Sequence, residues 1–344
     1  MVYNKTRNAL ALAGAIATFV VVPHNNAFAW GSTGHRLIGV LAIRNLPSSL
    51  PDFLRSEDAA WQVGELAREP DRSKGSGDPH DRDLDPGHFV DVSDDLKILE
   101  GPSLNALPPT REEYDAALRK VGADEYKAGY LPYSIIDGWQ QLVKDFAYWR
   151  VDAAGEKFAK TDAARAWFKR DRLLREALTI RDLGYWAHFV GDGSQPMHAS
   201  VHYDGWGNFP NPEGFTTAKG THGHFEGAFV RANVGDADAQ AALAPYAPGT
   251  GPIPARVGAY LAATEAQVLP FYTLEKAHAF EGGGSAAGKA FAVERVAAGA
   301  SALRDLIADA WKASDDASVG YPGVSVKDAE AGKVEFLGPL QGLD

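Results

Sequence analysis

The sequence of 344 residues contains no cysteine. Disulfide bonds are therefore excluded, and so are a thiolate nucleophile and a zinc site with cysteine ligands. If the chain binds a metal, its ligands have to be His, Asp, Glu or backbone groups. Long apolar runs are also lacking after residue 29, so no later stretch predicts a membrane-spanning helix.

Residues 1–29 have the composition of an export signal. Lys5 and Arg7 form a positively charged start, an apolar run follows, and residues 27–29 read Ala-Phe-Ala, a small-x-small cleavage site. The apolar run is short for a membrane span, although an uncleaved anchor is an alternative. We expect cleavage after Ala29, a new N-terminus at Trp30, and a secreted or periplasmic protein.

Acidic residues outnumber basic ones, 45 Asp and Glu against 34 Lys and Arg. Lys5 and Arg7 are the only charged residues of the signal, so the processed chain has 32 Lys and Arg and a formal net charge of −13. This balance argues against binding duplex nucleic acid by counterion release. It does not exclude phosphodiester substrates at a metal cluster, because bound cations can be the largest local charges in a site.

Apolar residues with a period near 3.6 predict helices over most of the chain. Neither an internal repeat nor an alternation of strands and helices is present. We therefore expect an all-α fold: one helical domain over residues 30–344, with long loops and an irregular tail after about residue 314. The predicted helices cover residues 37–46, 61–68, 111–120, 133–151, 162–167, 172–192, 254–268 and 287–311.

The helix predicted over residues 172–192, whose apolar positions begin at Leu173 and Leu174, carries the first chemical signal. His188 and Asp192 stand four residues apart, so their side chains project from one face and can meet at one ion. A glycine and a proline end this helix, and His198 follows just past the turn. Zinc takes such nitrogen and oxygen ligands. A single His/Asp pair on a helix is usually only a hydrogen-bonded pair, so further ligands are needed.

Three other stretches supply ligand types. Trp30 and His35 open the processed chain, where a deprotonated α-amino group is a competent ligand. A second i, i+4 pair, His222 and Glu226, can share one helix face, although His224 is an alternative ligand to His222. The third stretch, residues 69–95, is rich in Pro, Gly and Asp and reads as a loop laid across the metal-bearing helix; its candidates are Asp71, Lys74, His88, Phe89 and Asp91.

Together these motifs resemble the superfamily that joins bacterial zinc-dependent phospholipases C to the single-strand-specific zinc nucleases and 3′-nucleotidases of fungi and plants. The resemblance covers residues 30 to about 230 and implies three zinc ions at the bottom of a cleft between helices. The motifs that carry it are WGSTGH at 30–35, Asp71-x-x-Lys74, HFVD at 88–91, HFVGDGSQPMH at 188–198 and His222-x-x-x-Glu226. The implied ligands are Asp71, His88, His188 and Asp192 for one zinc, His198, His222 and Glu226 for the second, and for the third the amine and carbonyl of Trp30, His35 and a shared Asp192.

The resemblance also implies a mechanism. A water held between two zinc ions has its pKa lowered towards 7 and attacks phosphorus in line, while the third zinc stabilises the leaving oxygen. Asp91 would orient or deprotonate that water, and Lys74 would offset charge on the phosphoryl oxygens. Phe89 would stack on a base or pack on an acyl or choline group. Each has a plain alternative: Asp91 and Lys74 as solvated residues of a charged loop, and Phe89 as a core residue.

Three functions are compatible with these patterns. We favour an exported nuclease or 3′-nucleotidase that cleaves P–O3′ bonds of single-stranded nucleic acid, because of HFVD and Asp71-x-x-Lys74. The alternative is a zinc-dependent phospholipase C acting on phospholipid headgroups, since Glu226 and Gly227 stand where the nucleases more often carry Asp and Asn. The third is a non-catalytic exported zinc-binding protein, which the three-ligand second group disfavours because structural zinc sites have four protein ligands. No stable protein partner is expected.

Overall fold

The computed structural model describes residues 30–74, 79–333 and 338–341. Within these ranges the chain is mostly helical, which confirms the predicted all-α class. The strands in the described ranges, β1 (Ser318–Val319) and β2 (Val324–Ser325), form one antiparallel pair. None of the described helices combines the length and the hydropathy of a bilayer span. The predicted export signal, residues 1–29, lies outside the described residues.

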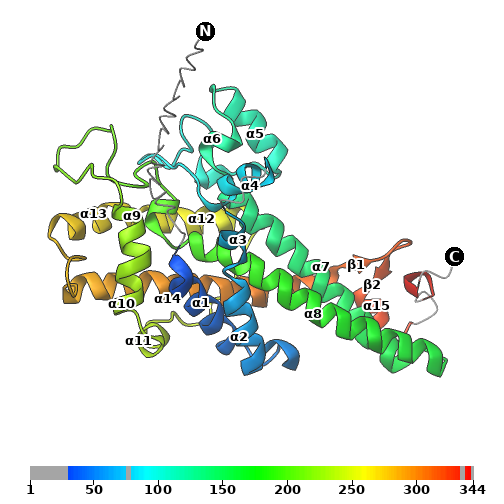
Figure 1. The fold of residues 1–344 in the computed structure, drawn as a ribbon. Coiled ribbons are helices and arrows are strands. Elements are labelled where there is room, and N and C mark those ends of the chain that lie inside the picture. The colour runs from blue at the N-terminus through cyan, green and yellow to red at the C-terminus, as the bar shows by residue number, and fades with distance from the viewer. Residues whose placement is uncertain (1–29, 75–78, 334–337, 342–344) are drawn as a thin grey trace, which may run out of the picture.

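Two long helices, α7 (Leu131–Phe158) and α8 (Asp162–Asp192), pack side by side and form the frame of the molecule (Figure 1). A glycine allows them to approach closely, because a Cβ at Gly138 would lie only 2.0 Å from Cδ1 of Trp186. The indole N–H of Trp186 donates to the carbonyl oxygen of Ile135 at 2.9 Å. This contact fixes the C-terminal half of α8 in the main core.

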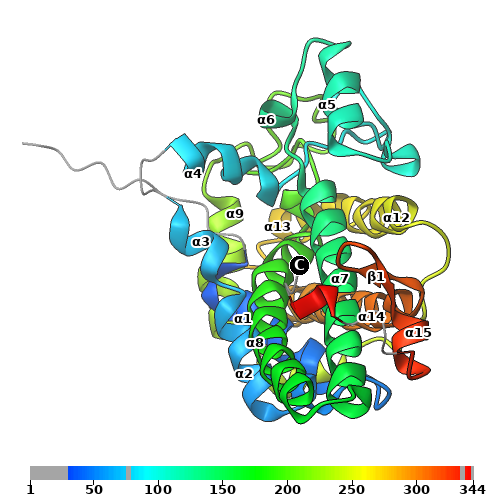
Figure 2. The ribbon, with the colours of Figure 1, turned by 90° about the vertical axis from the view of Figure 1, so that its right-hand side faces the viewer.

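Other helices cover the pair on both sides. In Figure 2, α1 (Gly31–Arg44) and α2 (Glu57–Leu66) lie on the α8 side, while α14 (Ala286–Ala313) and α15 (Val326–Glu330) lie on the α7 side. The remaining α-helices are α3 (Glu69–Ser73), α4 (Pro79–Leu84), α5 (Arg111–Arg119), α6 (Glu125–Ala128), α9 (Thr221–Gly223), α10 (Val230–Asn233), α11 (Asp236–Ala241), α12 (Ile253–Glu265) and α13 (Val268–Lys276).

The first half of α8 differs from the sequence-based expectation in two ways. The helices predicted over residues 162–167 and 172–192 are one helix, because no glycine or proline interrupts the chain between them. Leu173 and Leu174, the first apolar positions of the predicted helix, are 50% and 63% exposed. This half of α8 extends past the main core. Its apolar side chains still recur with the helical period, but few neighbouring segments are present to cover them.

Three other expectations need correction. The loop expected over residues 69–95 contains two short helices, α3 and α4. The helix predicted to reach residue 268 ends at Glu265, and the unpredicted α13 follows. The first part of the tail, residues 315–333, packs in a second, smaller core, in which Val319, Val324 and Val326 lie with Val151 of α7.

Candidate metal centre

Ligand-type side chains from seven elements meet at the C-terminal end of α8. The carbonyl groups of a helix C-terminus carry partial negative charge, which favours cations nearby. The contributing residues are His35 of α1, Asp71 of α3, His88 of the 3-10 turn Asp85–His88, His188 and Asp192 of α8, His198 of the 3-10 turn Pro196–His198, His222 of α9 and Glu226 of the π-helix His224–Phe229. Seven of these eight side chains are buried, and Asp71 is partly exposed.

The eight residues form three groups that could each hold a metal ion, with ligand atoms within 4.8 Å of one another. The groups are Asp71–His88–His188, His35–His188–Asp192 and His198–His222–Glu226. The last contains the same residues as the second zinc site implied by the resemblance.

One imidazole belongs to two of these groups. Nδ1 of His188 lies 2.8 Å from the carbonyl oxygen of Ala67, so only its Nε2 is available, and that atom can serve one ion. An ion bound to Asp71, His88 and His188 therefore leaves His35 and Asp192 for another ion. The resemblance implies a similar division, except that both ions share Asp192 and the backbone of Trp30 supplies further ligands to the ion at His35.

Asp192 lies between the groups. Its Oδ2 is 3.2 Å from Nδ1 of His88 and 3.2 Å from Nε2 of His188, while its Oδ1 is 3.4 Å from Nε2 of His35. Oδ1 is also 3.9 Å from Nδ1 of His198. The two oxygens of one buried carboxylate thus face different sets of imidazoles, and Asp192 can bridge neighbouring ions.

Several buried polar atoms of this centre have no hydrogen-bond partner among the described residues. They include both ring nitrogens of His35, Nε2 of His198, Oδ1 of Asp192 and Oε1 of Glu226. An unpaired buried polar group destabilises a fold by about 1–3 kcal/mol. Five such atoms in one place indicate that the side chains are arranged for coordination, and nitrogen and carboxylate donors fit a divalent metal.

Backbone groups orient the imidazoles. Nδ1 of His198 lies 2.5 Å from the carbonyl oxygen of His88 and donates to it, as Nδ1 of His188 does to Ala67. Both rings therefore direct Nε2 towards the centre, and a backbone carbonyl bonded to Nδ1 is the usual outer contact of a metal-bound imidazole.

Gln195 is a contributor that sequence reasoning missed. Its Nε2 donates to Oε2 of Glu226 at 3.2 Å, and its Oε1 accepts the backbone N–H of Met197 at 2.7 Å. The side chain is fully buried. Its place between Asp192 and His198 was the only signal in the sequence, because the contact with Glu226 depends on the fold.

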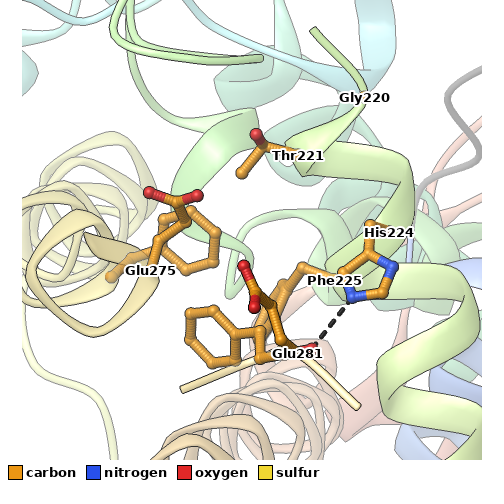
Figure 3. Close-up of a pocket in the computed structure, with 8 residues that line it drawn as sticks. Gly220, Thr221, His224, Phe225, Glu275 and Glu281 are labelled. Atoms are coloured by element: carbon orange, nitrogen blue, oxygen red, sulfur yellow. Dashed lines mark hydrogen bonds between the residues drawn. The ribbon is translucent and has the colours of Figure 1, made fainter. Parts of the chain in front are cut away.

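The second i, i+4 pair meets, but on an irregular helix. Nε2 of His222 lies 2.7 Å from Oε2 of Glu226, although the backbone changes from α-helix to π-helix at His224. Single π-helical turns are rare and often occur at functional sites. His224 is not in the group: its Nε2 donates to the carbonyl oxygen of Phe280 at 2.9 Å, and it lines a separate pocket with Glu275 on the opposite side (Figure 3).

Trp30 lies at the edge of the centre. Its indole N–H donates to the carbonyl oxygen of Gly191 at 2.7 Å, and its own carbonyl accepts the N–H of Gly34 at 3.1 Å. Gly31 has φ +45°, and a Cβ there would lie 3.1 Å from the carbonyl oxygen of Glu226. The start of α1 therefore passes directly against Glu226. The predicted role of the Trp30 amine depends on cleavage outside the described residues and stays a prediction.

The three predicted substrate-contacting residues have different surroundings. Nζ of Lys74 is 2.9 Å from Oδ1 of Asp71, which places Lys74 at the metal centre. Within the described residues no hydrogen bond or ion pair joins the carboxyl of Asp91 to the centre. Phe89 is partly buried, and its ring packs against Gly129. The roles of Asp91 and Phe89 stay predictions.

Burial and neighbouring charges shift several pKa values here. Burial lowers the pKa of His88 to about 3 and that of His35 well below its usual value. For Asp192 burial acts in the opposite direction, but the charges of His188 and His198 lower its pKa well below the usual range. Burial lowers the pKa of His198 as well, but Asp192 and Glu226 outweigh it and raise that pKa to about 8. His35 and His88 are therefore neutral, as a metal ligand must be, whereas His198 has to release a proton when a cation binds.

Asp91 behaves differently. Burial raises the pKa of its carboxyl to about 7, although the charge of Lys127 acts in the opposite direction. A carboxyl group that titrates near neutral pH is suited to proton transfer.

The ligand set restricts the metal without naming it. Imidazole and carboxylate suit zinc, and other divalent first-row metals bind such sites as well. What the geometry establishes is three adjacent groups of buried His, Asp and Glu side chains that could hold metal ions. A comparison of this chain with protein-family models, with curated proteins and with solved structures finds no match.

Proposed function

We propose that this chain is an exported, zinc-dependent hydrolase of phosphate esters, and that it acts on single-stranded nucleic acid and 3′-nucleotides. The observation that carries the proposal is the set of unpartnered buried ligand atoms in three groups joined by Asp192. Three adjacent cations would attract the negatively charged oxygens of a phosphoryl group, whereas a neutral substrate would gain little from them.

The ligand count supports catalysis over storage. The His198–His222–Glu226 group offers three side-chain ligands, whereas structural zinc sites are closed by four protein ligands. Bound in these groups, divalent ions lower the pKa of water and neutralise charge on phosphoryl oxygens. The chain supplies the rigid placement of the ligands, since seven of the eight side chains are buried.

Two residues act beside the ions in this proposal. Lys74 is held by Asp71 with its side chain 15% exposed, so its ammonium group can face both the centre and a bound substrate. There it offsets the negative charge that builds on the phosphoryl oxygens. The carboxylate of Asp91 accepts the proton of the attacking water, for which a pKa of about 7 is well matched at neutral pH.

The alternative substrate is a phospholipid headgroup at the same centre. It is supported by Glu226, whose longer side chain reaches His222 and Gln195 from the π-helix. Both substrate classes require the same chemistry at phosphorus, so only an assay separates them.

The test is a parallel assay of the purified, processed protein on a single-stranded oligonucleotide, a 3′-nucleotide and phosphatidylcholine. We expect cleavage of the first two, loss of activity with a chelator, and recovery with zinc. Activity on the lipid alone would replace the nuclease by the phospholipase. Inactivity on all three with metal bound would refute a phosphate-ester hydrolase.

A further inference from the structure

A cavity of about 270 Å³ opens beside the His198–His222–Glu226 group, between the start of α1 and the π-helix. We call it the α1 cavity. Its lining includes Ser32, Thr33, Gly223, Glu226, Gly227 and Arg231. No role in the proposed reaction has been assigned to this space so far.

Glu226 connects the α1 cavity to the metal centre. Glu226 lines the cavity and is 1% exposed, and its backbone carbonyl oxygen faces the start of α1, where a Cβ at Gly31 would lie 3.1 Å from it. Its carboxylate is buried beside the cavity: Oε2 faces His222 and Gln195, and Oε1 has no hydrogen-bond partner among the described residues. A cation held by this carboxylate would add positive charge next to the cavity.

The wall formed by α1 favours negative charge as well. The first three N–H groups of a helix have no acceptor within it, and here they belong to residues 31–33. Trp30, the N-cap, contributes no side-chain cap, and the first turn contains no acidic residue. A helix of 14 residues also adds its dipole, so this end is a site for an oxyanion.

Arg231 completes the wall. The side chain is exposed and makes no ion pair with any described residue, in a chain where acidic residues are in excess. Guanidinium groups bind phosphate oxygens through two parallel hydrogen bonds. Hydroxyl groups of Ser32 and Thr33 add neutral donors beside it.

The α1 cavity is open because two lining residues have no side chain. A Cβ at Gly223 or Gly227 would meet no atom within 4 Å, and neither glycine has a positive φ. Side chains can therefore be introduced at these positions without disturbing the fold, and they would project into open space.

We propose that the α1 cavity binds a second phosphate group of a nucleic-acid strand, adjacent to the phosphate that is hydrolysed. Lys74 stands at the Asp71–His88–His188 group and Arg231 beside Glu226 of another group, so cationic side chains accompany two different parts of the centre. A ligand with successive phosphates fits this arrangement, whereas a substrate with a single phosphate leaves the α1 cavity unused. This inference rests on the proposed nuclease function.

The experiment uses trithymidylates in which one linkage is a charged phosphodiester and the other is either charged or a neutral methylphosphonate. Both placements of the neutral linkage are tested with the zinc-loaded enzyme. We expect the second charge to raise kcat/KM at least about fivefold for one placement. In Arg231→Gln the kcat/KM values of the fully charged and the half-neutral trimer should become equal. The slope of log KM against log salt concentration should decrease by about 0.7.

Matched variants separate charge from shape. Gly227→Asp places a carboxylate in the α1 cavity and should reverse the preference for the second charge, whereas the isosteric Gly227→Asn should keep most of it. Arg170→Gln removes an exposed, unpaired arginine on the distant half of α8 and should leave the ratio unchanged. Calorimetry with a fully charged trimer that carries non-cleavable phosphorothioate linkages should show the same loss of affinity in Arg231→Gln.

The outcomes distinguish the two proposals. Hydrolysis of all three trimers at equal kcat/KM, or a preference that Arg231→Gln and Gly227→Asp leave intact, overturns the α1 cavity as a phosphate site while the nuclease function stands. If the zinc-loaded enzyme cleaves none of the three trimers, the proposed function itself fails.

Discussion

The two halves of α8 bury titratable groups in opposite ways. In the first half the charges find partners in the chain: Arg172 pairs with Glu156 at 2.8 Å and also with Glu176. In the second half, His188 and Asp192 face imidazoles and carboxylates, several of whose atoms lack hydrogen-bond partners among the described residues. The charges of the first half therefore pair within the chain, whereas the second half offers ligand atoms that could hold metal ions.

The carboxyl groups of the frame show a third situation. Burial and the neighbouring Asp171 raise the pKa of Asp152 to about 8, and burial with Asp182 raises that of Asp145 to about 6. These groups stay protonated at acidic and, for Asp152, at neutral pH instead of binding a cation. Buried acid groups alone thus do not make a metal site; converging imidazoles with unpartnered nitrogens do.

The largest expected effect separates the two histidines of α9 and the π-helix. His222→Ala removes a ligand-type nitrogen from the centre and should lower kcat/KM by about a thousandfold or more, with loss of bound metal. His224→Ala is the control, because His224 bonds to Phe280 outside the centre and should keep both metal and activity. Equal losses in the two variants would contradict the assignment.

Asp91 tests the proton acceptor. We expect Asp91→Asn to lower kcat by about a hundredfold, because a positioned base contributes on this scale. In the native enzyme the rate should rise with pH through about 7, as the carboxyl loses its proton, and this rise should be absent from the variant. Asp95→Asn, an exposed residue of the same segment, should retain the profile. A variant with normal kcat would remove Asp91 from the mechanism.

Gln195 tests the outer contacts of the centre. Gln195→Ala removes the donor to Glu226, and outer contacts of this kind typically affect metal affinity by about 10- to 100-fold. Competition with a chelator should show this loss for the ion at His198, His222 and Glu226, with a smaller change for the others. Unchanged affinity would mean that Glu226 is held by the π-helix alone.

The smallest effect concerns the frame. The folded state keeps a proton on Asp152 between pH 4 and 8 that the unfolded chain releases, so wild-type stability should fall as pH rises through this window. Asp152→Asn should flatten the pH dependence by about 1 kcal/mol or more in zinc-saturated denaturant titrations. Asp145→Asn should act over the narrower window up to pH 6. A pH dependence unchanged by Asp152→Asn would contradict the raised pKa.

Spacing along the chain predicted the local part of the centre. His188 and Asp192 are four residues apart on a regular helix, and the periodicity of α8 determines that their side chains meet. The same reasoning predicted that His222 and Glu226 lie on one helix face. It could not predict the π-helical turn, because it assumes the regular period of 3.6 residues. Contacts that join distant segments, such as Gln195 with Glu226, follow from the packing and leave no local pattern.

The fold shows the same division. Helix periodicity predicted the all-α class and most long helices, because it records which residues alternate between core and solvent. It does not say where the neighbouring helices end, so it could not show that Leu173 and Leu174 are exposed. It predicted the helix start at Asp162, where Thr161 caps α8 by accepting the N–H of Ala164, but divided α8 into two helices.

Elemental analysis of the purified, processed protein after dialysis tests the central claim most directly. We expect close to three equivalents of divalent metal per chain, with zinc predominating. Each equivalent corresponds to one of the three ions proposed at the C-terminal end of α8. A folded protein that contains no divalent metal and takes up none from zinc-containing buffer would contradict the account.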